Sequence, residues 1–182
     1  TEGDLQSTGN DLDIAIEGKG FFRITMPDGE TAYTRNGQFK VNSDGSIVNG
    51  NGYLLDPEIV IPDNLIKINV AADGLITATD PTTGEEQEVG QITLSDFVNS
   101  AGLEPLGESL FKATTASGDP IDANPTEEQF GNLRQGFVEM SNVKLVTEMV
   151  DLITAQRAYE ANSKAIQTAD KLLTIANQLK TS

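Results

Sequence analysis

Apolar and polar residues alternate with a period of two along much of the first 136 residues, as at residues 12–17 and 65–70. Such alternation predicts half-buried β-strands. Turn-forming sequences separate the apolar runs, and each contains a glycine: Pro27-Asp28-Gly29, Asn36-Gly37, Ser43-Asp44-Gly45, Ala72-Asp73-Gly74 and Pro81-Thr82-Thr83-Gly84. Asn36-Gly37 predicts a two-residue hairpin, because both central positions of a type I′ turn require a positive φ. The pattern is typical of an antiparallel barrel or sandwich-like domain.

The predicted β domain covers residues 1–136. Its core is expected at about residues 9–115, where the turn signals are regularly spaced. Beyond Ser95 the strand signal weakens, and residues 117–125 indicate an irregular loop. We therefore expect residues 116–136 to form a loop and a return segment.

A second pattern follows Gly136. Residues 137–182 contain neither glycine nor proline, and from about Asn142 to Leu179 apolar residues recur every three or four positions. This spacing predicts one long C-terminal α-helix with an apolar stripe broader than a two-stranded coiled-coil seam. We therefore assign residues 137–182 to a separate helical segment.

The predicted helix is longer than the predicted β domain is wide. A helix of about 40 residues spans about 60 Å, whereas a globule of about 130 residues is about 36 Å across. One β domain therefore leaves part of the apolar stripe uncovered. Since an isolated helix gains little stability without tertiary packing, we expect the stripe to pack against helices of other copies or of a further segment.

Charge and composition exclude several functional classes. The 182 residues carry 28 acidic and 12 basic side chains, a net charge of −16, and include no His, Cys or Trp. The missing His and Cys exclude the catalytic triads and zinc sites that depend on them. The acidity argues against nucleic-acid binding, and no apolar run reaches the length of about 18 residues that a membrane span requires. We predict no catalytic residue, no metal and no cofactor.

The charge is unevenly distributed along the chain. Residues 1–136 hold 23 acidic and 7 basic side chains, whereas residues 137–182 hold 5 of each. The whole excess of negative charge therefore belongs to the predicted β domain. The neutral helical segment lacks a net repulsion that would oppose the bundling of several copies.

Several motifs resemble those of flagellar rod and hook proteins, and together they cover nearly all of the chain. The C-terminal motifs are Ser141-Asn142-Val143, Glu148-Met149-Val150 and Ala155-Gln156-Arg157-Ala158-Tyr159-Glu160-Ala161-Asn162-Ser163-Lys164. The motifs of the β domain are Thr8-Gly9-Asn10, Leu12-Asp13-Ile14-Ala15-Ile16, Gly18-Lys19-Gly20-Phe21-Phe22, Tyr33-Thr34-Arg35-Asn36-Gly37 and Phe97-Val98-Asn99-Ser100-Ala101-Gly102-Leu103. Within this family the chain looks most like the distal rod members, with the proximal rod members as the near alternative.

The resemblance implies a structural subunit, not an enzyme, of the periplasmic rod that transmits torque from the flagellar motor to the hook. It implies as partners further copies of the chain in a helical filament, other rod proteins and the hook protein at the ends, and the surrounding rings. Members of the family are exported without a cleaved signal peptide. In the family an N-terminal helix pairs with the C-terminal helix, and we expect this partner helix to lie outside the sequence, since Thr1 lies just upstream of the predicted β domain.

We predict that the helical segment makes the contacts between subunits. The predicted contact residues are Leu145, Met149, Leu152, Gln156, Arg157, Tyr159, Glu160, Asn162, Lys164, Ile166 and Leu173. Two alternatives from other functional classes stay open. The uneven charge also suits an acidic secreted binding module on a helical stalk, and paired carboxylates such as Glu85 and Glu86 would suit a hydrolase.

Overall fold

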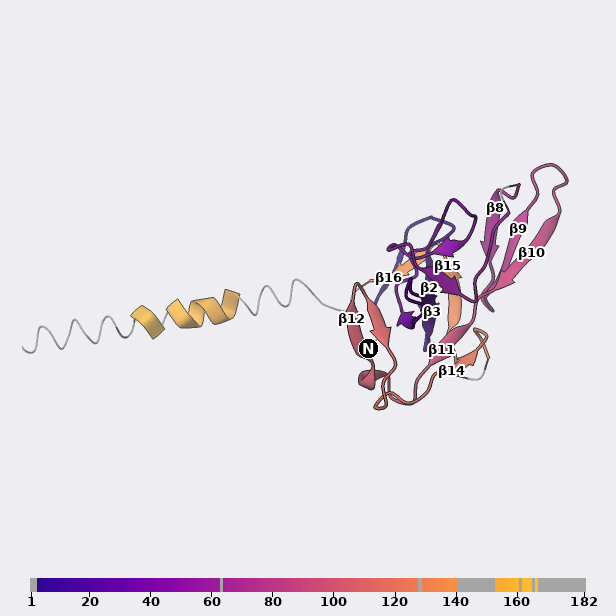
Figure 1. Cartoon of the computed structure of the whole chain (residues 1–182). Helices are drawn as coiled ribbons and strands as arrows, with labels where there is room; N and C mark the ends of the chain where they lie inside the picture. Colours follow the sequence, from indigo (N-terminus) through magenta and orange to yellow (C-terminus); the bar gives the residue numbers. More distant parts are fainter. Residues whose placement is uncertain are drawn as a thin grey trace, which may run out of the picture. The chain divides into compact units, whose positions relative to one another are not determined.

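The computed structural model describes residues 3–62, 64–127, 129–140, 153–160, 162–164 and 166. The chain divides into two compact units, Thr1–Met140 and Ser141–Ser182. The described part of the first unit is built of β-strands, and residues 153–160, 162–164 and 166 of the second are helical (Figure 1). The predicted fold, mainly antiparallel β with a C-terminal helix, is confirmed. The rest of the helix predicted from Asn142 to Leu179 lies outside the described residues.

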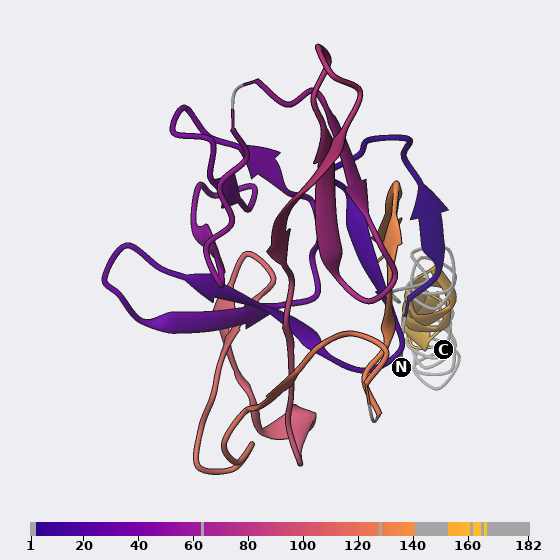
Figure 2. The same ribbon diagram turned by 90° about the vertical axis from the view of Figure 1, so that its right-hand side faces the viewer.

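The described strands of the β unit form four sheets (Figures 1 and 2). The largest contains β3 (Phe21–Thr25), β4 (Thr31–Thr34), β5 (Lys40–Val41), β6 (Ile47–Val48), β7 (Leu54–Asp56), β11 (Leu94–Asp96), β12 (Glu104–Gly107), β13 (Leu110–Lys112) and β14 (Ile121–Ala123). A three-stranded sheet contains β8 (Lys67–Val70), β9 (Leu75–Thr79) and β10 (Glu86–Gln91). Two-stranded sheets pair β1 (Leu5–Ser7) with β16 (Phe137–Glu139), and β2 (Ile14–Glu17) with β15 (Asn132–Gln135).

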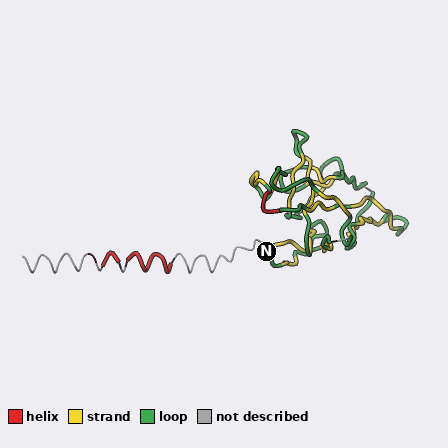
Figure 3. Tube along the Cα trace, turned by 90° about the horizontal axis from the view of Figure 1, so that it is seen from below, coloured by secondary structure: helices red, strands yellow, loops and turns green. Residues whose placement is uncertain are grey.

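Strand β3 is central to the largest sheet. It pairs with β4 along one edge, and along the other edge with β7 at residues 23–25 and with β11 at residues 21–22. All of these ladders are antiparallel, and the described sheets do not close into a barrel. Figure 3 shows how much of the unit consists of loops between short strands, with one 3₁₀ turn, η1 (Ser100–Gly102), among its described residues.

Two groups of buried side chains hold the β unit together. The larger core brings together residues from most of the strands, and in it the rings of Phe22 and Phe39 meet edge to face, 5.1 Å between centroids. The smaller core contains Tyr33, Phe97 and Leu103. Edge-to-face ring pairs add stability beyond the area that they bury.

The turns predicted at Asp28-Gly29, Asp44-Gly45 and Asp73-Gly74 are confirmed. They connect β3 to β4, β5 to β6 and β8 to β9, and each glycine has a positive φ, between 82° and 88°. These turns form because glycine adopts this backbone conformation without the steric cost that a Cβ imposes.

The hairpin predicted at Asn36-Gly37 is wrong. Strand β4 ends at Thr34 and pairs with β3 and β13, and Gly37 does not have a positive φ. Instead the carbonyl of Gly37 accepts a hydrogen bond from the backbone N–H of Ile14 (2.9 Å). A Cβ at Gly37 would lie 1.6 Å from the carbonyl oxygen of Ile14, so the glycine permits a close backbone approach between distant segments and not a local turn.

Two segments near the end of the β unit also differ from expectation. The predicted irregular loop at residues 117–125 contains β14, which pairs with β11. Residues 137–139, which we assigned to the helical segment, form β16 and pair with β1. Both strands are only three residues long, and each pairs with a strand that is distant in the sequence. Neither strand therefore carries a strong local signal.

Candidate assembly surfaces

The described residues of the helical unit are almost all exposed. Tyr159 and Ile166 leave 77% and 64% of their surface accessible. Each helical residue turns the chain by about 100°, so two residues seven positions apart lie within about 20° of each other on one face. Tyr159 and Ile166 therefore form an apolar face on the helix, and the predicted contact residue Gln156 lies beside it.

The charged members of the predicted contact set lie on another face of the helix. Arg157, Glu160 and Lys164 follow one another at spacings of three and four, which places neighbouring side chains on the same side. Asn162 lies four positions before Ile166 and so borders the apolar face, and it is exposed like the others. Four of the predicted contact residues lie outside the described residues: Leu145, Met149, Leu152 and Leu173.

A short antiparallel ladder closes the β unit where the chain passes toward the helical unit. Strand β1 pairs with β16, with Leu5 opposite Glu139 and Ser7 opposite Phe137. The ladder is extended by hydrogen bonds from Thr8 N to Gly136 O (2.8 Å) and, at the other end, from Met140 N to the carbonyl of residue 4 (2.9 Å). The first and last described segments of this unit are therefore held side by side.

Arg35 fixes this ladder to the rest of the β unit. Its Nε lies 2.7 Å from Glu139 Oε2, and its two Nη atoms donate to the carbonyls of residues 16, 18 and 20 at 2.9–3.2 Å. Glu139 in turn accepts a hydrogen bond from the N–H of Gly3 (2.9 Å). The guanidinium thus joins β16 to β2 and to the loop between β2 and β3, and its planar set of donors suits this combination of carboxylate and carbonyls.

A groove opens beside Arg35. A hollow of about 560 Å³ is lined by residues that include Lys19, Phe21, Arg35, Phe97 and Val98. An adjoining hollow of about 260 Å³ shares three of these residues, Lys19, Phe97 and Val98. Val98 is 84% exposed, and together with the half-buried Phe21 it gives the hollow an apolar wall.

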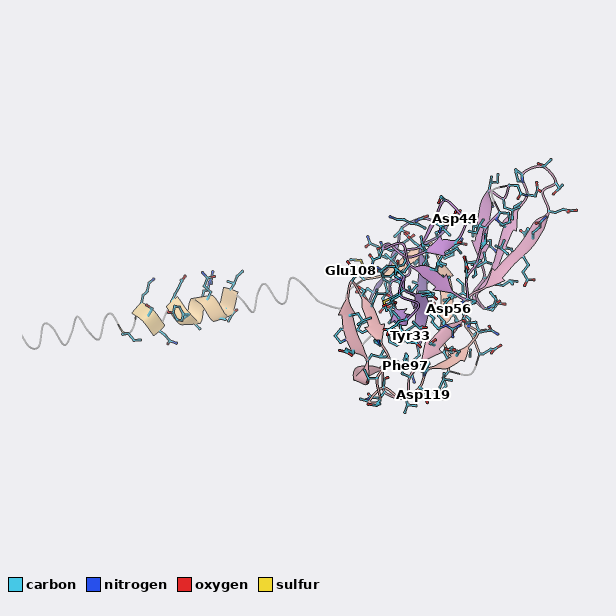
Figure 4. All side chains as sticks on the ribbon, viewed as in Figure 1. Tyr33, Asp44, Asp56, Phe97, Glu108 and Asp119 are labelled. Carbon is cyan, nitrogen blue, oxygen red and sulfur yellow. The ribbon has the colours of Figure 1, made fainter. Side chains whose placement is uncertain are left out.

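A cluster of polar groups lies behind the groove. Arg23 Nε lies 2.6 Å from Asp56 Oδ2, and Arg23 also pairs with Asp122. Burial, followed by the negative charge of Asp122, raises the pKa of the Tyr33 phenol. The Tyr33 ring meets the Phe97 ring edge to face, 4.8 Å between centroids, and Figure 4 labels both residues near each other. These contacts tie one wall of the groove to β3 and β4.

The described residues offer no arrangement typical of a metal centre or a membrane span. They contain no group of three or more metal-ligating side chains placed to hold an ion. No helix among them has both the length and the apolar content to cross a bilayer.

Two protein-family models match the chain. The flagellar hook protein FlgE/F/G D1 domain matches residues 15–78, and the flagellar basal body rod FlgEFG protein C-terminal model matches residues 134–179. The flagellar basal-body rod protein FlgG of Borreliella burgdorferi is 49% identical over 181 residues, which cover 98% of this chain and 68% of the relative. The chain belongs to the flagellar basal-body rod protein family. This confirms the resemblance inferred from its motifs.

Other relatives agree with this placement. The FlgG of Agrobacterium fabrum is 45% identical over 178 residues, covering 98% of this chain and 68% of the relative. The flagellar hook-basal body complex protein FlhP of Bacillus subtilis is 30% identical over 189 residues, covering 98% and 69%. The rod-family chain is thus a structural subunit of the flagellar basal-body rod. Membership of this family implies self-assembly and association with other flagellar components.

Sequence reasoning placed the contact residues on the helix and missed the groove and the Arg35 anchor. Arg35, Lys19 and Val98 all lie within the motifs that carried the resemblance. The motifs showed that these three residues belong to the family pattern, but they did not indicate what each residue does. The acceptors of Arg35 include three backbone carbonyls, which leave no signature in the sequence.

Proposed function

We propose that the chain is a distal rod subunit, which polymerises into the periplasmic drive shaft and transmits torque from the motor to the hook. Its partners are further copies of itself in a helical filament, other rod proteins and the hook protein at the ends, and the surrounding rings. It reaches the rod through flagellar export without a cleaved signal peptide. The relatives named FlgG are 42–49% identical, against 30% for FlhP, which supports the distal assignment over other members of the family.

The exposed apolar face of the helical unit carries this proposal. Tyr159 and Ile166 share one face and are 77% and 64% exposed. Keeping this apolar surface in water is unfavourable in free energy, so burying it favours association. A second copy of the same helix offers the matching surface, and the helical segment is electrically neutral enough to bundle. Helices that pack along the axis resist bending because many small contacts act together.

The β1–β16 ladder braces the last described residues of the β unit, those that precede the helical segment in the sequence. Because β1 and β16 are paired, and Arg35 binds Glu139, a force on the chain at Met140 acts on a hydrogen-bonded ladder before it reaches the core. We infer that this short, braced segment resists a load applied to the chain at Met140.

The experiment replaces Tyr159 by alanine and, as a matched control, by phenylalanine in the host that makes the protein. Loss of the ring removes about 2 kcal/mol of burial from each contact between subunits, or roughly thirtyfold in affinity. We expect Tyr159→Ala to reduce swimming and the number of complete rods seen by electron microscopy. Tyr159→Phe keeps the apolar area, so it should assemble almost normally. Since Tyr159 is 77% exposed, neither change should alter the fold of a single chain.

Normal motility and rod length with Tyr159→Ala would reject this role for the helix face. Electron microscopy of the unmodified protein separates the wider possibilities. Filaments favour the rod subunit, whereas discrete stalked particles would favour the acidic binding module that the uneven charge also suits.

A further inference from the structure

One surface of the β unit combines the exposed side chain of Val98 with a cation, Lys19, that forms no ion pair among the described residues. We define the Lys19 groove by Lys19, Phe21, Phe97 and Val98, which line the hollow of about 560 Å³. Lys19 is exposed, and Val98 is 84% exposed. Apolar walls with an exposed charge at the rim are typical of a surface that recognises another protein.

Lys19 differs from most basic side chains of this acidic unit. The described ion pairs of residues 3–140 engage these four: Arg23, Arg35, Lys112 and Arg134. Lys19 forms no ion pair within the described part of the chain. The one carboxylate that lines both hollows, Asp96, is held by the backbone N–H of Phe97 (2.8 Å). Arg35 pairs with Glu139, the other carboxylate of the larger hollow, so Lys19 is the cation there that stays open to a partner among the described ion pairs.

The opposite features occur at one end of the three-stranded sheet. In the β8–β9–β10 ladder, Lys67 and Glu86 both lie opposite Thr79, so the chain next to Thr79 forms the end of the sheet. Ile66 lies there, hydrogen-bonded through its N–H to Thr79 O (3.3 Å), and it is 72% exposed. Asp80 follows Thr79, and its backbone N–H bonds to Glu85 O (3.0 Å). We call Ile66, Asp80, Glu85 and Glu86 the acidic tip.

One carboxylate of the acidic tip is held in place by its own turn. Asp80 accepts a hydrogen bond from the backbone N–H of Thr82 (2.7 Å), and this bond lowers the pKa of its carboxyl group. The carboxylate is therefore both ionised and positioned by its own turn. A charge that is already fixed loses little conformational freedom when it meets a partner.

We propose that the acidic tip of one copy docks on the Lys19 groove of a neighbouring copy in the rod. The proposal rests on the proposed function, and it names two β-unit surfaces through which subunits meet. Ile66 would pack against Val98 and Phe97, and the carboxylates of the tip would surround Lys19. Lys19 and the carboxylates of the tip carry opposite charges, although both belong to the same acidic chain.

The positions of the two surfaces suit an open polymer. The turn that joins β9 to β10 and the 3₁₀ turn η1, which follows Val98 closely in sequence, lie at opposite ends of the β unit (Figures 1 and 2). Each copy then presents one tip and one groove at different ends. Contacts between different surfaces of identical subunits generate open helical filaments when the rotation does not close.

Cross-linking tests the contact directly, because the chain contains no cysteine. The double variant Ile66→Cys with Val98→Cys is expressed as the full-length protein in its host, and isolated rods are oxidised and run without reductant. We expect a ladder of disulfide-linked multimers, since docking would bring the two positions within about 6 Å. The matched control pairs Ile66→Cys with Leu106→Cys, which is 44% exposed but outside the groove, and it should give no ladder.

Charge reversal gives a second readout that does not depend on disulfide geometry. Lys19→Glu should raise the protein concentration needed for polymerisation about fivefold, the usual scale of an exposed ion pair, and Glu86→Lys in the same chain should restore much of it. If intact rods form but yield no ladder, and Lys19→Glu assembles normally, the docking proposal is overturned while the proposed function stands. If the unmodified protein forms no rods, the proposed function fails instead.

Discussion

Replacing Arg35 by alanine tests whether one side chain holds the β1–β16 ladder to the core. The change removes an ion pair with Glu139 and three hydrogen bonds to backbone carbonyls. It leaves the Glu139 carboxylate only 12% exposed and without a cation. No other described basic side chain forms an ion pair with that carboxylate.

The expected cost is a substantial part of the stability of the unit. Removing one partner of a buried ion pair costs about 3–5 kcal/mol, and hydrogen bonds that involve a charged group contribute about 1.5–3 kcal/mol each. Arg35 is 22% exposed, so water replaces part of this interaction and the lower end of the range applies. We expect Arg35→Ala to lower the free energy of unfolding by about 3 kcal/mol, out of about 5–15 kcal/mol for a domain.

Urea unfolding followed by near-ultraviolet circular dichroism of the tyrosines measures this free energy, and hydrogen exchange of Thr8 and Gly9 reports the ladder itself. Arg35→Lys, which keeps the charge and loses the planar donors, should fall between the wild type and Arg35→Ala. Adding Glu139→Gln to Arg35→Ala should recover part of the loss, because no charge is then left buried. A loss below about 1 kcal/mol for Arg35→Ala, or strictly additive effects in the double variant, would refute the anchor.

Two further predictions concern the interior of the β unit. The pKa of Tyr33 is raised by burial and by Asp122, so the folded protein keeps the phenol proton to a higher pH than the unfolded chain. The stability that depends on this proton is complete below the ordinary pKa of about 10, and it is lost as the pH rises from there through the pKa of the folded protein. The free energy of unfolding should therefore be lower above this pH range than below it for the wild type. For Tyr33→Phe, the difference should be much smaller. Gly37→Ala places a Cβ 1.6 Å from the Ile14 carbonyl oxygen and should cost about 3 kcal/mol or more. Gly50→Ala, where no atom lies within 4 Å, is the control and should change stability by less than about 0.5 kcal/mol in the same denaturation assay.

The sequence predicts those features of the fold that neighbouring residues decide. The turns at Asp28-Gly29, Asp44-Gly45 and Asp73-Gly74 form because glycine alone relieves the strain of a positive φ. Asn36-Gly37 has an equally strong local signal, yet its glycine is required by the backbone of Ile14 from another strand. The dipeptide alone therefore does not show whether its glycine serves a positive φ or a close approach of another backbone segment.

The ends of the β unit could not be placed from the sequence for a related reason. Strand β16 is three residues long, and its partner β1 is about 130 positions away in the chain. Without a glycine or proline after Gly136, local propensity does not separate residues 137–139 from the helix that follows. The pairing depends on tertiary contacts such as that of Arg35 with Glu139, which only the folded chain brings together.

Of the two candidate surfaces, the sequence predicts one and not the other. Tyr159 and Ile166 could be found from spacing, because a helix converts sequence distance directly into a face. The Lys19 groove could not, since Phe21 and Phe97 meet only when β11 pairs with β3. Their rings lie 6.0 Å apart between centroids although 76 positions separate them in the chain.

The distribution of charge links the fold to assembly. Residues 1–136 hold 23 acidic and 7 basic side chains. Among the residues that the structure describes there, four of the basic ones form ion pairs: Arg23, Arg35, Lys112 and Arg134. The positive charges therefore stabilise the fold, while the outer surface stays negative and repels identical neighbours at distances up to about 10 Å in moderate salt. Attraction between copies must then come from the neutral helical segment and from the few places, such as Lys19, where a cation remains exposed. This distribution of charge favours association only where surfaces match, which is what a subunit needs if it is to polymerise at the end of a growing shaft and nowhere else.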